Sequence, residues 1–245
     1  MKVVVISAHL DDFEVGFGGL AALLVSAGHE VISVNTIPGK ANVIHEGRSV
    51  TDVRKDESVK SHSILGLKPI ILSYFEQMLS VNPETRKVFQ ELILDLKPDC
   101  LFTHWGMDTN PDHRATSMLA IEPCLGKGVN TELFCYEVAS GRGRPQSLGF
   151  FPTHYVDIAE VLETKRKMVM CHASQNPDAI WNEQLSETHK MRGDELGFKY
   201  AEAYVRLTRF GHLHPELGKF LKPTSFQLPK GMSVVVDPQL IGLKV

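Results

Sequence analysis

The sequence lacks the features that mark secreted, membrane-bound or nucleic-acid-binding proteins. Only four of its 245 residues are cysteines, and none forms a Cys-x-x-Cys pair, which favours buried thiols over disulfides or cysteine ligands. The chain has no basic cluster, and its formal net charge of −3 argues against DNA or RNA as a partner. No apolar run approaches the roughly 20 residues of a membrane span, and the run after Lys2 ends before Ser7, too early for a signal peptide. We therefore expect a cytoplasmic protein that binds neither membranes nor nucleic acids.

Length and composition indicate one globular domain. The apolar fraction of 43% and the charged fraction of 22% are ordinary for a folded protein, and a chain of this length forms one sizeable domain. We expect a single domain over residues 1–245, with a core at about 2–207. Residues 208–245 are proline-rich and irregular apart from the apolar stretch 232–236, and we interpret them as a C-terminal extension.

Apolar runs typical of buried strands alternate with helical patterns along the first part of the chain. The expected strands are residues 2–8, 30–37, 69–74, 100–104 and 132–138, and the expected helices are residues 16–28, 50–65, 82–97 and 115–125. This alternation predicts an α/β, Rossmann-like fold with a mostly parallel sheet and helices on both faces. Further on, we expect an edge strand at 155–158 and helices at 159–171 and 183–207. Folds of this class place their sites beyond the carboxyl ends of the strands.

Two polar clusters follow predicted buried strands. The first is Ala8-His9-Leu10-Asp11-Asp12-Phe13-Glu14, and the second ends in Asn110-Pro111-Asp112-His113-Arg114. Imidazoles and carboxylates that are buried without partners cost several kcal/mol, so these residues need one another or a metal. Their position is where the predicted fold builds its functional site.

His9, Asp12 and His113 are the candidate metal ligands. His9 and Asp12 are three residues apart across a strand-to-helix turn, a spacing that can direct both side chains to one point, and His113 could complete the set. Three protein ligands with an open fourth position are typical of catalytic zinc, although iron(II) accepts the same ligands. Asp11, beside these ligands, could take the proton from a water that the metal activates.

Simpler interpretations exist for parts of these clusters. An Asp-Asp pair after a strand often caps the next helix, and a lone histidine such as His113 is more often a capping or surface residue. Capping does not explain a histidine at the head of the first cluster together with another behind an acid in the second. The glycines of residues 16–19, Gly16-Phe17-Gly18-Gly19, are also typical of a dinucleotide-binding site. The acids in the preceding turn would repel a pyrophosphate, however. These glycines fit close packing of a helix on the sheet better.

The two clusters resemble motifs of the PIG-L/LmbE-like family of N-acetylglucosaminyl deacetylases. The first motif, Ala-His-Pro/Ala-Asp-Asp with a following Glu and Gly-x-Gly-Gly, stands here as residues 8–19, and the second, His-Pro-Asp-His, as residues 110–113. Weaker matches follow in order: Arg54-Lys55-Asp56-Glu57, His172-Ala173-Ser174-Gln175 and Tyr200-Ala201-Glu202-Ala203-Tyr204. The likeness covers residues 2 to 205 of the chain.

The resemblance implies a Rossmann-like fold, zinc on the three ligands named above and Asp11 as the general base. Arg54 matches an arginine that helps to hold the sugar substrate in the family, and the alternative is a surface arginine paired with Glu57. The motif at residues 172–175 and the glutamate after the Asp pair are closest to the bacillithiol-pathway deacetylases. This likeness suggests a similar substrate and a homo-oligomeric, hexameric assembly.

One residue departs from the family pattern. Asn110 stands where the family usually has a histidine, which pairs with the acid at Asp112, stabilises the oxyanion and can protonate the leaving amine. Asparagine can donate a hydrogen bond to an oxyanion but cannot transfer a proton at neutral pH. Asp11 would then have to return the proton, or His104 would have to reach in. We name Asp11, Asn110 and Asp112 as the candidate catalytic residues.

The sequence therefore predicts a zinc-dependent hydrolase that removes an N-acetyl group from a glucosamine-containing small molecule. In this prediction Asp11 acts on a metal-activated water, and the metal and Asn110 share the oxyanion. Two alternatives remain: an amidase for another small amide, and a non-catalytic homologue that binds metal and sugar. Contacts that select the substrate are expected in variable loops, at residues 38–48 and 140–152.

Overall fold

The central element of the protein is a mixed β-sheet. The computed structural model describes residues 1–45, 47–125, 129, 131–138, 149–207 and 213–224. The strands of the sheet are β1 (Lys2–Ser7), β2 (Glu30–Asn35), β5 (Ile70–Ile71), β6 (Cys100–His104), β7 (Glu132–Tyr136), β8 (His154–Asp157), β9 (Ala201–Arg206) and β10 (Lys222–Pro223). Their spatial order is β10-β8-β9-β7-β6-β1-β2-β5. A separate small ribbon pairs β3 (Ile44–His45) with β4 (Arg48–Ser49).

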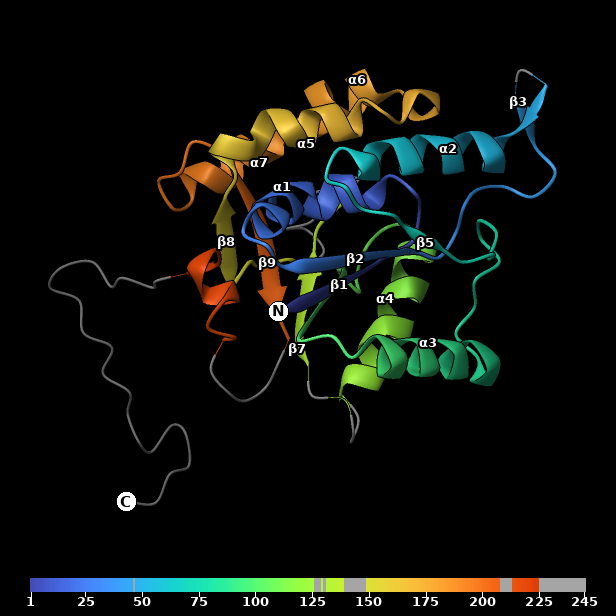
Figure 1. Cartoon of the computed structure of the whole chain (residues 1–245), viewed down its shortest axis with the longest axis horizontal. Helices are drawn as coiled ribbons and strands as arrows, with labels where there is room; N and C mark the ends of the chain where they lie inside the picture. Colours follow the sequence, from blue (N-terminus) through green and yellow to red (C-terminus); the bar gives the residue numbers. More distant parts are fainter. Residues whose placement is uncertain (46, 126–128, 130, 139–148, 208–212, 225–245) are drawn as a thin grey trace, which may run out of the picture.

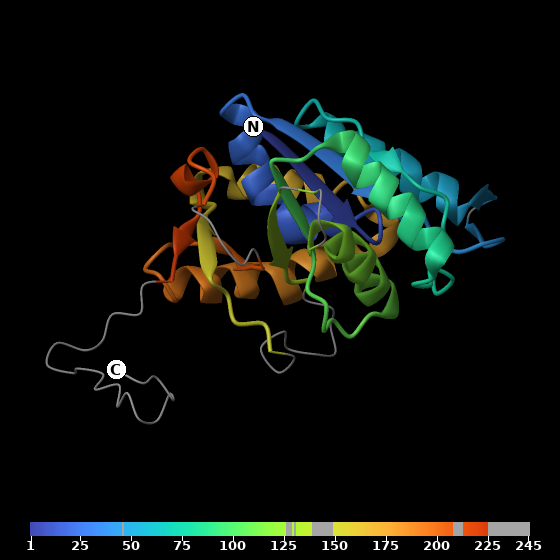
Figure 2. The same cartoon turned by 90° about the horizontal axis from the view of Figure 1, so that it is seen from below.

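Helices cover both faces of this sheet. The α-helices are α1 (Asp12–Ser26), α2 (Val50–Ser63), α3 (Pro83–Leu96), α4 (Pro111–Leu125), α5 (Leu162–Val169), α6 (Pro177–Ala179) and α7 (Ser186–Asp194). Short 3₁₀ turns lie at Ala159–Val161, Ala173–Gln175 and Leu217–Lys219, and η4 (Ile180–Leu185) is a π-helix. In Figure 1, α1, α2 and α5 lie above the sheet and α3 and α4 below it. Figure 2 gives a second view of α3 and α4, which pack side by side.

The predicted, mostly parallel sheet is confirmed. Strands β7, β6, β1, β2 and β5 are parallel neighbours, whereas β9 runs antiparallel to β7 and to β8, and β10 runs antiparallel to β8. Since β1 and β6 pair directly at the centre of the sheet, their carboxyl ends lie side by side. The two polar clusters of the sequence follow these two strands.

The continuous apolar run of β1 is explained by burial on both of its faces. Val3 and Val5 pack with Phe17 of α1 in one hydrophobic core. Val4, between them, faces the opposite core and packs with Phe89 of α3. The strand ends that carry the polar clusters are therefore held between two packed helical layers.

The glycines of α1 allow close packing on the sheet, as the sequence suggested. A Cβ atom added at Gly16 would overlap the ring of Tyr136 on β7, and one at Gly19 would lie 2.6 Å from a methyl carbon of Ile158. Side chains at these positions would push the helix away from the sheet. The close approach fixes the first turn of α1 over the ends of the strands.

Residues 183–207 do not form the single helix that we expected. Helix α7 ends at Asp194, Gly197 adopts a φ of +75°, and residues 201–206 form β9 between β7 and β8. Every residue from Ala201 to Val205 is buried, and periodicity cannot distinguish a fully buried strand from a buried helix. The expected edge strand at 155–158 is β8, which lies one place inside the edge because β10 pairs with it.

Other boundaries differ in ways that bear on the site. Helices α1 and α4 begin at Asp12 and Pro111, four residues earlier than expected, so both polar clusters extend into first turns of helices. Strand β5 covers only residues 70–71. The expected C-terminal extension contributes β10 to the sheet, while its apolar stretch at 232–236 and the loop at 140–148 lie outside the described residues.

Two further expectations concern cysteines and membranes. All four cysteines are free thiols, two of them buried and two partly buried, in agreement with the sequence analysis. In the part of the chain that the structure describes, no helix has the length and apolar character needed to cross a bilayer.

Candidate active site

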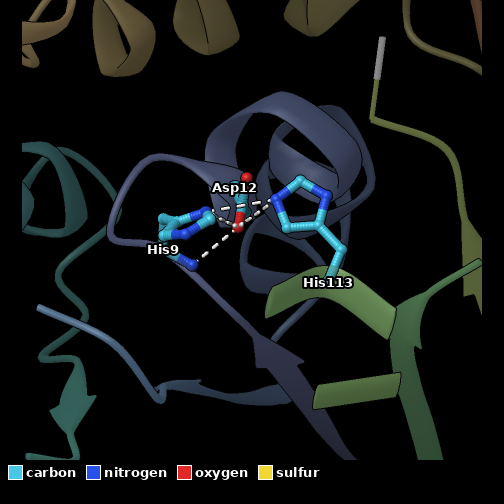
Figure 3. Close-up of side chains that lie close together, drawn as sticks. All are labelled: His9, Asp12 and His113. Atoms are coloured by element: carbon cyan, nitrogen blue, oxygen red, sulfur yellow. Dashed lines mark hydrogen bonds and ion pairs between the residues drawn. The ribbon is translucent and has the colours of Figure 1, made fainter. Parts of the chain in front are cut away.

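The two polar clusters meet at the carboxyl ends of β1 and β6. His9 follows β1, Asp12 is the first residue of α1, and His113 lies in the first turn of α4. Figure 3 shows the three side chains pointing toward one another from these separate elements. Although 104 residues separate His9 from His113, the pairing of the two strands brings them into contact.

The distances among these three residues fit a single metal ion. His9 Nδ1 lies 3.1 Å from His113 Nε2, and Asp12 Oδ2 lies 3.3 Å from His9 Nδ1 and 3.4 Å from His113 Nε2. Bonds of about 2.0–2.1 Å to a tetrahedral zinc separate ligand atoms by about 3.3 Å. The three atoms therefore form one face of a tetrahedron of the size that zinc requires. They are one of two groups of side chains among the described residues that could hold a metal, and the second, His104, Asp108 and His113, shares His113 with the first.

The electrostatics of this group also favour a cation. Burial lowers the pKa of His9, but Asp12 and a hydrogen bond to Asp112 more than offset it and raise that pKa to about 10. Burial likewise opposes protonation of His113, and Asp12 and Asp108 raise its pKa to about 9. In the protein without metal, protons thus occupy the place that a divalent cation would take.

Each candidate ligand histidine is oriented by a second carboxylate. His9 Nε2 lies 3.2 Å from Asp112 Oδ2, and Asp112 in turn accepts hydrogen bonds from the backbone N–H of Gln77. His113 Nδ1 lies 3.1 Å from Asp108 Oδ2. Carboxylates in this position fix the ring and make the free nitrogen a better ligand. The sequence analysis assigned no role to Asp108, although its position five residues before His113 was a usable signal.

His104 is buried beneath the three candidate ligands and does not line the cavity. It is fully buried, its Nε2 accepts a hydrogen bond from the backbone N–H of Ala8 (2.9 Å), and the same atom lies 3.3 Å from Asp12 Oδ2. Its ring stacks on His113 at 4.1 Å. Burial lowers its pKa to about 4, so it is neutral at pH 7. His104 therefore supports Asp12 and His113 and does not reach toward a substrate.

A cavity of about 340 Å³ opens over the candidate ligands. A volume of this size is in the range of about 300–1,000 Å³ that is usual for small-molecule sites. The residues that line it are His9, Asp11, Asp12, Val15, Arg54, Glu76, Asn110, His113, Val138, Gln175, Ile180 and Gln184. Asp11 therefore lines the same cavity as the three candidate ligands.

Arg54 reaches the cavity from α2 and pairs with Glu76. Its Nη1 donates to Glu76 Oε1 at 2.7 Å, and both side chains are mostly buried. The alternative pairing with Glu57 does not occur, because Glu57 accepts hydrogen bonds from the backbone N–H and the hydroxyl of Ser174. Glu76 was missed in the sequence analysis, since it lies in a loop after the short β5 and outside any motif.

Asn110 caps α4 and also lines the cavity. Its side-chain carbonyl accepts the backbone N–H of Asp112 at 2.9 Å, while its own backbone N–H donates to Asp108 Oδ1 at 2.7 Å. Asparagine is among the residues that cap helices best. Because the carbonyl oxygen is used for the cap, the amide NH₂ remains the group that Asn110 can offer to a ligand.

A third buried cluster lies behind Asp11. Glu14 is fully buried, and His62 Nδ1 and His172 Nε2 each lie 3.3 Å from one of its oxygens. Burial disfavours a charge on His172, but Glu14 outweighs it and raises the pKa of His172 to about 9. The contact between His172 and Glu14 ties the segment at residues 172–175 to α1.

The fold and the site together define a class of protein. Two imidazoles and one carboxylate converge at the strand ends of an α/β sheet, below a cavity that a further carboxylate lines, which is the arrangement of metal-dependent hydrolases.

Comparison with known proteins identifies the family. The family model of PIG-L, described as GlcNAc-PI de-N-acetylase, matches residues 4–124. The diacetylchitobiose deacetylase of Thermococcus kodakarensis is 30% identical over 241 residues, covering 86% of this chain and 88% of that protein. This chain therefore belongs to the PIG-L family of N-deacetylases.

Solved structures share the fold. The N,N'-diacetylchitobiose deacetylase from Pyrococcus horikoshii matches with a TM-score of 0.70 and 26% identity, over 84% of this chain and 83% of that one. The 4-carboxy-2-hydroxymuconate hydratase from Pseudomonas putida matches with a TM-score of 0.71 and 19% identity, over 87% and 99% of the two chains. The fold alone therefore does not determine the reaction.

Proposed function

We propose that this protein is a zinc-dependent deacetylase of a small N-acetylated amino sugar. The observation that carries the proposal is the convergence of His9, Asp12 and His113 at 3.1–3.4 Å beneath the cavity. The relatives named as diacetylchitobiose deacetylases support an acetamido sugar as the substrate. Iron(II) suits the same ligands, so the choice of zinc as the metal is itself part of the proposal.

Asp11 serves as the base in this reaction. The bound metal supplies a positive charge that lowers the pKa of a water molecule and polarises the amide carbonyl. Burial, and next to it the charge of Asp12, raise the pKa of the Asp11 carboxyl, which helps Asp11 to hold the proton that it takes from the water. Asp11 then delivers that proton to the leaving amine, because Asn110 cannot transfer one.

Asn110, Asp112 and Arg54 have positioning roles. The amide NH₂ of Asn110 donates a hydrogen bond to the developing oxyanion, and Asp112 holds His9 in the orientation that binds metal. Arg54, fixed by Glu76, contacts the sugar hydroxyls. In this proposal Asp112 orients the candidate ligand His9. In the family pattern, the same acid would instead pair with a histidine at position 110.

The first test measures release of free amine from N-acetylglucosamine, its methyl glycoside and N,N'-diacetylchitobiose. Protein treated with a chelator is compared with the same protein after zinc is restored. We expect amine release only from the zinc-restored protein. A metal-loaded protein that is inert on all three sugars would refute the proposal.

Asn110 favours one second candidate, a non-catalytic protein that binds the metal and the sugar. The substitution Asn110→His separates the two candidates. A large gain from near-zero activity would support the non-catalytic protein, and little change or a loss would support an enzyme built around asparagine. An amidase for another small amide is the remaining alternative, and it would release amine from a non-sugar acetamide.

We also propose that the protein is cytoplasmic and forms a homo-oligomer, a hexamer in the assembly that the sequence motifs suggest. Light scattering on the purified protein tests the assembly. A mass of 27.3 kDa, that of the single chain, would contradict it.

A further inference from the structure

The far wall of the cavity is built from residues that have no role in holding the metal. Val138, Gln175, Ile180 and Gln184 line this side, and we call them the amide wall. The wall comes from the segment that follows β7 and from the segment around α6 and η4, and Val138 and Ile180 pack in the same hydrophobic cluster. It is therefore placed to meet whatever the N-acetylated sugar carries.

The π-helix η4 sets the direction of two wall residues. Ile180 and Gln184 line the cavity, while Trp181 and Leu185 pack into the core with Val15. π-Helical turns are rare and often occur at functional sites. Gln184 is half-buried, and its side chain makes no hydrogen bond to the residues that the structure describes, so its amide can serve a ligand.

Gln175 is held in place through α2. Its Nε2 donates to the hydroxyl of Ser174 at 2.9 Å, and that hydroxyl donates to Glu57 at 2.6 Å. The carbonyl oxygen of Gln175 remains available as an acceptor. Since α2 also carries Arg54, one helix positions both sides of the cavity.

No residue of the amide wall carries a charge that could pair with an anionic group. Among its described lining residues, Arg54 is the one with a permanently positive side chain, and Glu76 neutralises it at 2.7 Å. Asp11 and Asp12 add negative charge on the side of the candidate metal ligands, where the two positive charges of a bound zinc would offset it, so the metal leaves no excess cation on the amide wall. A phosphate or carboxylate on the substrate would find no unpaired cation on the amide wall, whereas hydroxyl groups match amides and a sugar ring face matches Ile180 and Val138.

We propose that the amide wall selects an N-acetylated sugar whose neighbouring group is uncharged and rich in hydroxyls, and that Gln184 is a specificity-determining residue. This inference rests on the proposed deacetylase function and narrows its substrate class. It disfavours a substrate that carries a phosphate or carboxylate next to the N-acetylated sugar.

The test compares kcat/KM for N,N'-diacetylchitobiose with kcat/KM for the 1-phosphate and the 6-phosphate of N-acetylglucosamine. We expect the zinc-loaded protein to prefer the neutral disaccharide by at least tenfold. Gln184→Ala should raise KM for the disaccharide about three- to tenfold, the loss of one hydrogen bond, with a smaller effect on kcat. Gln184→Arg should shift the preference toward the phosphates by about tenfold, since it adds an unpaired cation.

Asn182→Ala is the matched control, because Asn182 is exposed on the same π-helix and does not line the cavity. It should leave the preference unchanged. Equal or better rates with the sugar phosphates, or an unchanged KM in Gln184→Ala, would overturn this inference while the deacetylase function stands. Failure to release amine from any of these sugars would refute the function itself, and this inference with it.

Discussion

Asp11 and Asp12 are adjacent in sequence, yet their surroundings move the pKa values of their carboxyl groups in opposite directions. Burial raises the pKa of Asp12, but three imidazoles, above all that of His113, more than offset it and hold the pKa well below its ordinary value. For Asp11 the balance is the reverse: burial, and next to it the charge of Asp12, outweigh the opposing charges of His172, His9 and Arg54 and raise its pKa. Environment thus separates a permanently ionised ligand from a group able to accept a proton.

Asp11→Asn should abolish turnover without removing the metal. The amide cannot accept the proton, so we expect a loss of about 10²–10⁴-fold in kcat, with zinc content equal to that of the original protein. Zinc is measured by atomic emission and activity by amine release. In the companion variant Asp12→Asn, both the activity and the zinc content should fall. An Asp11→Asn protein with full activity would disprove the role of Asp11 as the base.

Glu14→Gln should destabilise the protein, because it leaves the charge of the buried His172 without its partner. Breaking a buried ion pair costs about 3 kcal/mol or more, and the free energy of unfolding in urea measures it. Glu163→Gln is the control, since Glu163 pairs with Arg166 at 3.8 Å in an exposed i,i+3 contact worth under about 1 kcal/mol. Equal effects of the two substitutions would show that the Glu14 cluster contributes no special stability.

At the scale of elements, the sequence predicted strands best in short apolar runs, as in β1 and β6, which are both buried, and helices best where a capping motif marks the first turn. The strand at 100–104 matches β6 in both bounds, and the helix at 82–97 begins where Asn82 and Thr85 form a capping box. The failure at residues 201–206 has a physical cause, because a buried strand cannot be distinguished by its periodicity from the continuation of a buried helix, and these residues follow the helical pattern of α7. The contact that identifies β9 as a strand, its pairing with β7 and β8, is long-range.

Gly16→Ala should destabilise the protein by about 1–3 kcal/mol, the usual cost of overpacking. The added methyl group would overlap the ring of Tyr136, although alanine is the better helix former. Gly106→Ala is the control, because its added Cβ would meet its nearest neighbour at 3.7 Å; its effect should stay within about 0.5 kcal/mol. Thermal unfolding of both variants measures the difference, and an equally stable Gly16→Ala protein would contradict the close packing of α1.

At the scale of the whole molecule, the sequence indicated which residues form the site but not how they divide the work. The positions of His9 and His113 after two predicted buried strands indicated that they would lie close together. They do so because β1 and β6 are parallel neighbours. Nothing in the spacing showed that Asp112 contacts His9 or that Glu76, from a loop, pairs with Arg54. Each of these two contacts joins segments far apart in the sequence, and a single sequence carries no signal for them; the contact of Asp108 with His113 is local, and the spacing of five residues could have indicated it.

Zinc should stabilise the whole protein, and by more at high pH than at low pH. Without metal, the folded-state pKa values of His9 and His113 are about 10 and about 9, against about 6.5 in the unfolded chain. The stability gained from these bound protons is fully present below pH 6.5 and is lost as the pH rises through 9 to 10. Zinc displaces the protons, so it competes with them at low pH and replaces their contribution at high pH.

We therefore expect the Tm of the zinc-free protein to fall between pH 6.5 and 9, and the zinc-dependent rise in Tm to grow over the same range. At a zinc concentration of about 100 times Kd the stabilisation is about 2.7 kcal/mol, which corresponds to roughly 5–10 °C for a chain of this size. Scanning calorimetry with and without zinc measures both trends. His113→Ala should abolish the zinc-dependent rise at every pH. If zinc raised the Tm equally at pH 6 and pH 9, protons and metal would not share one site, and the assignment of His9 and His113 as ligands would be wrong.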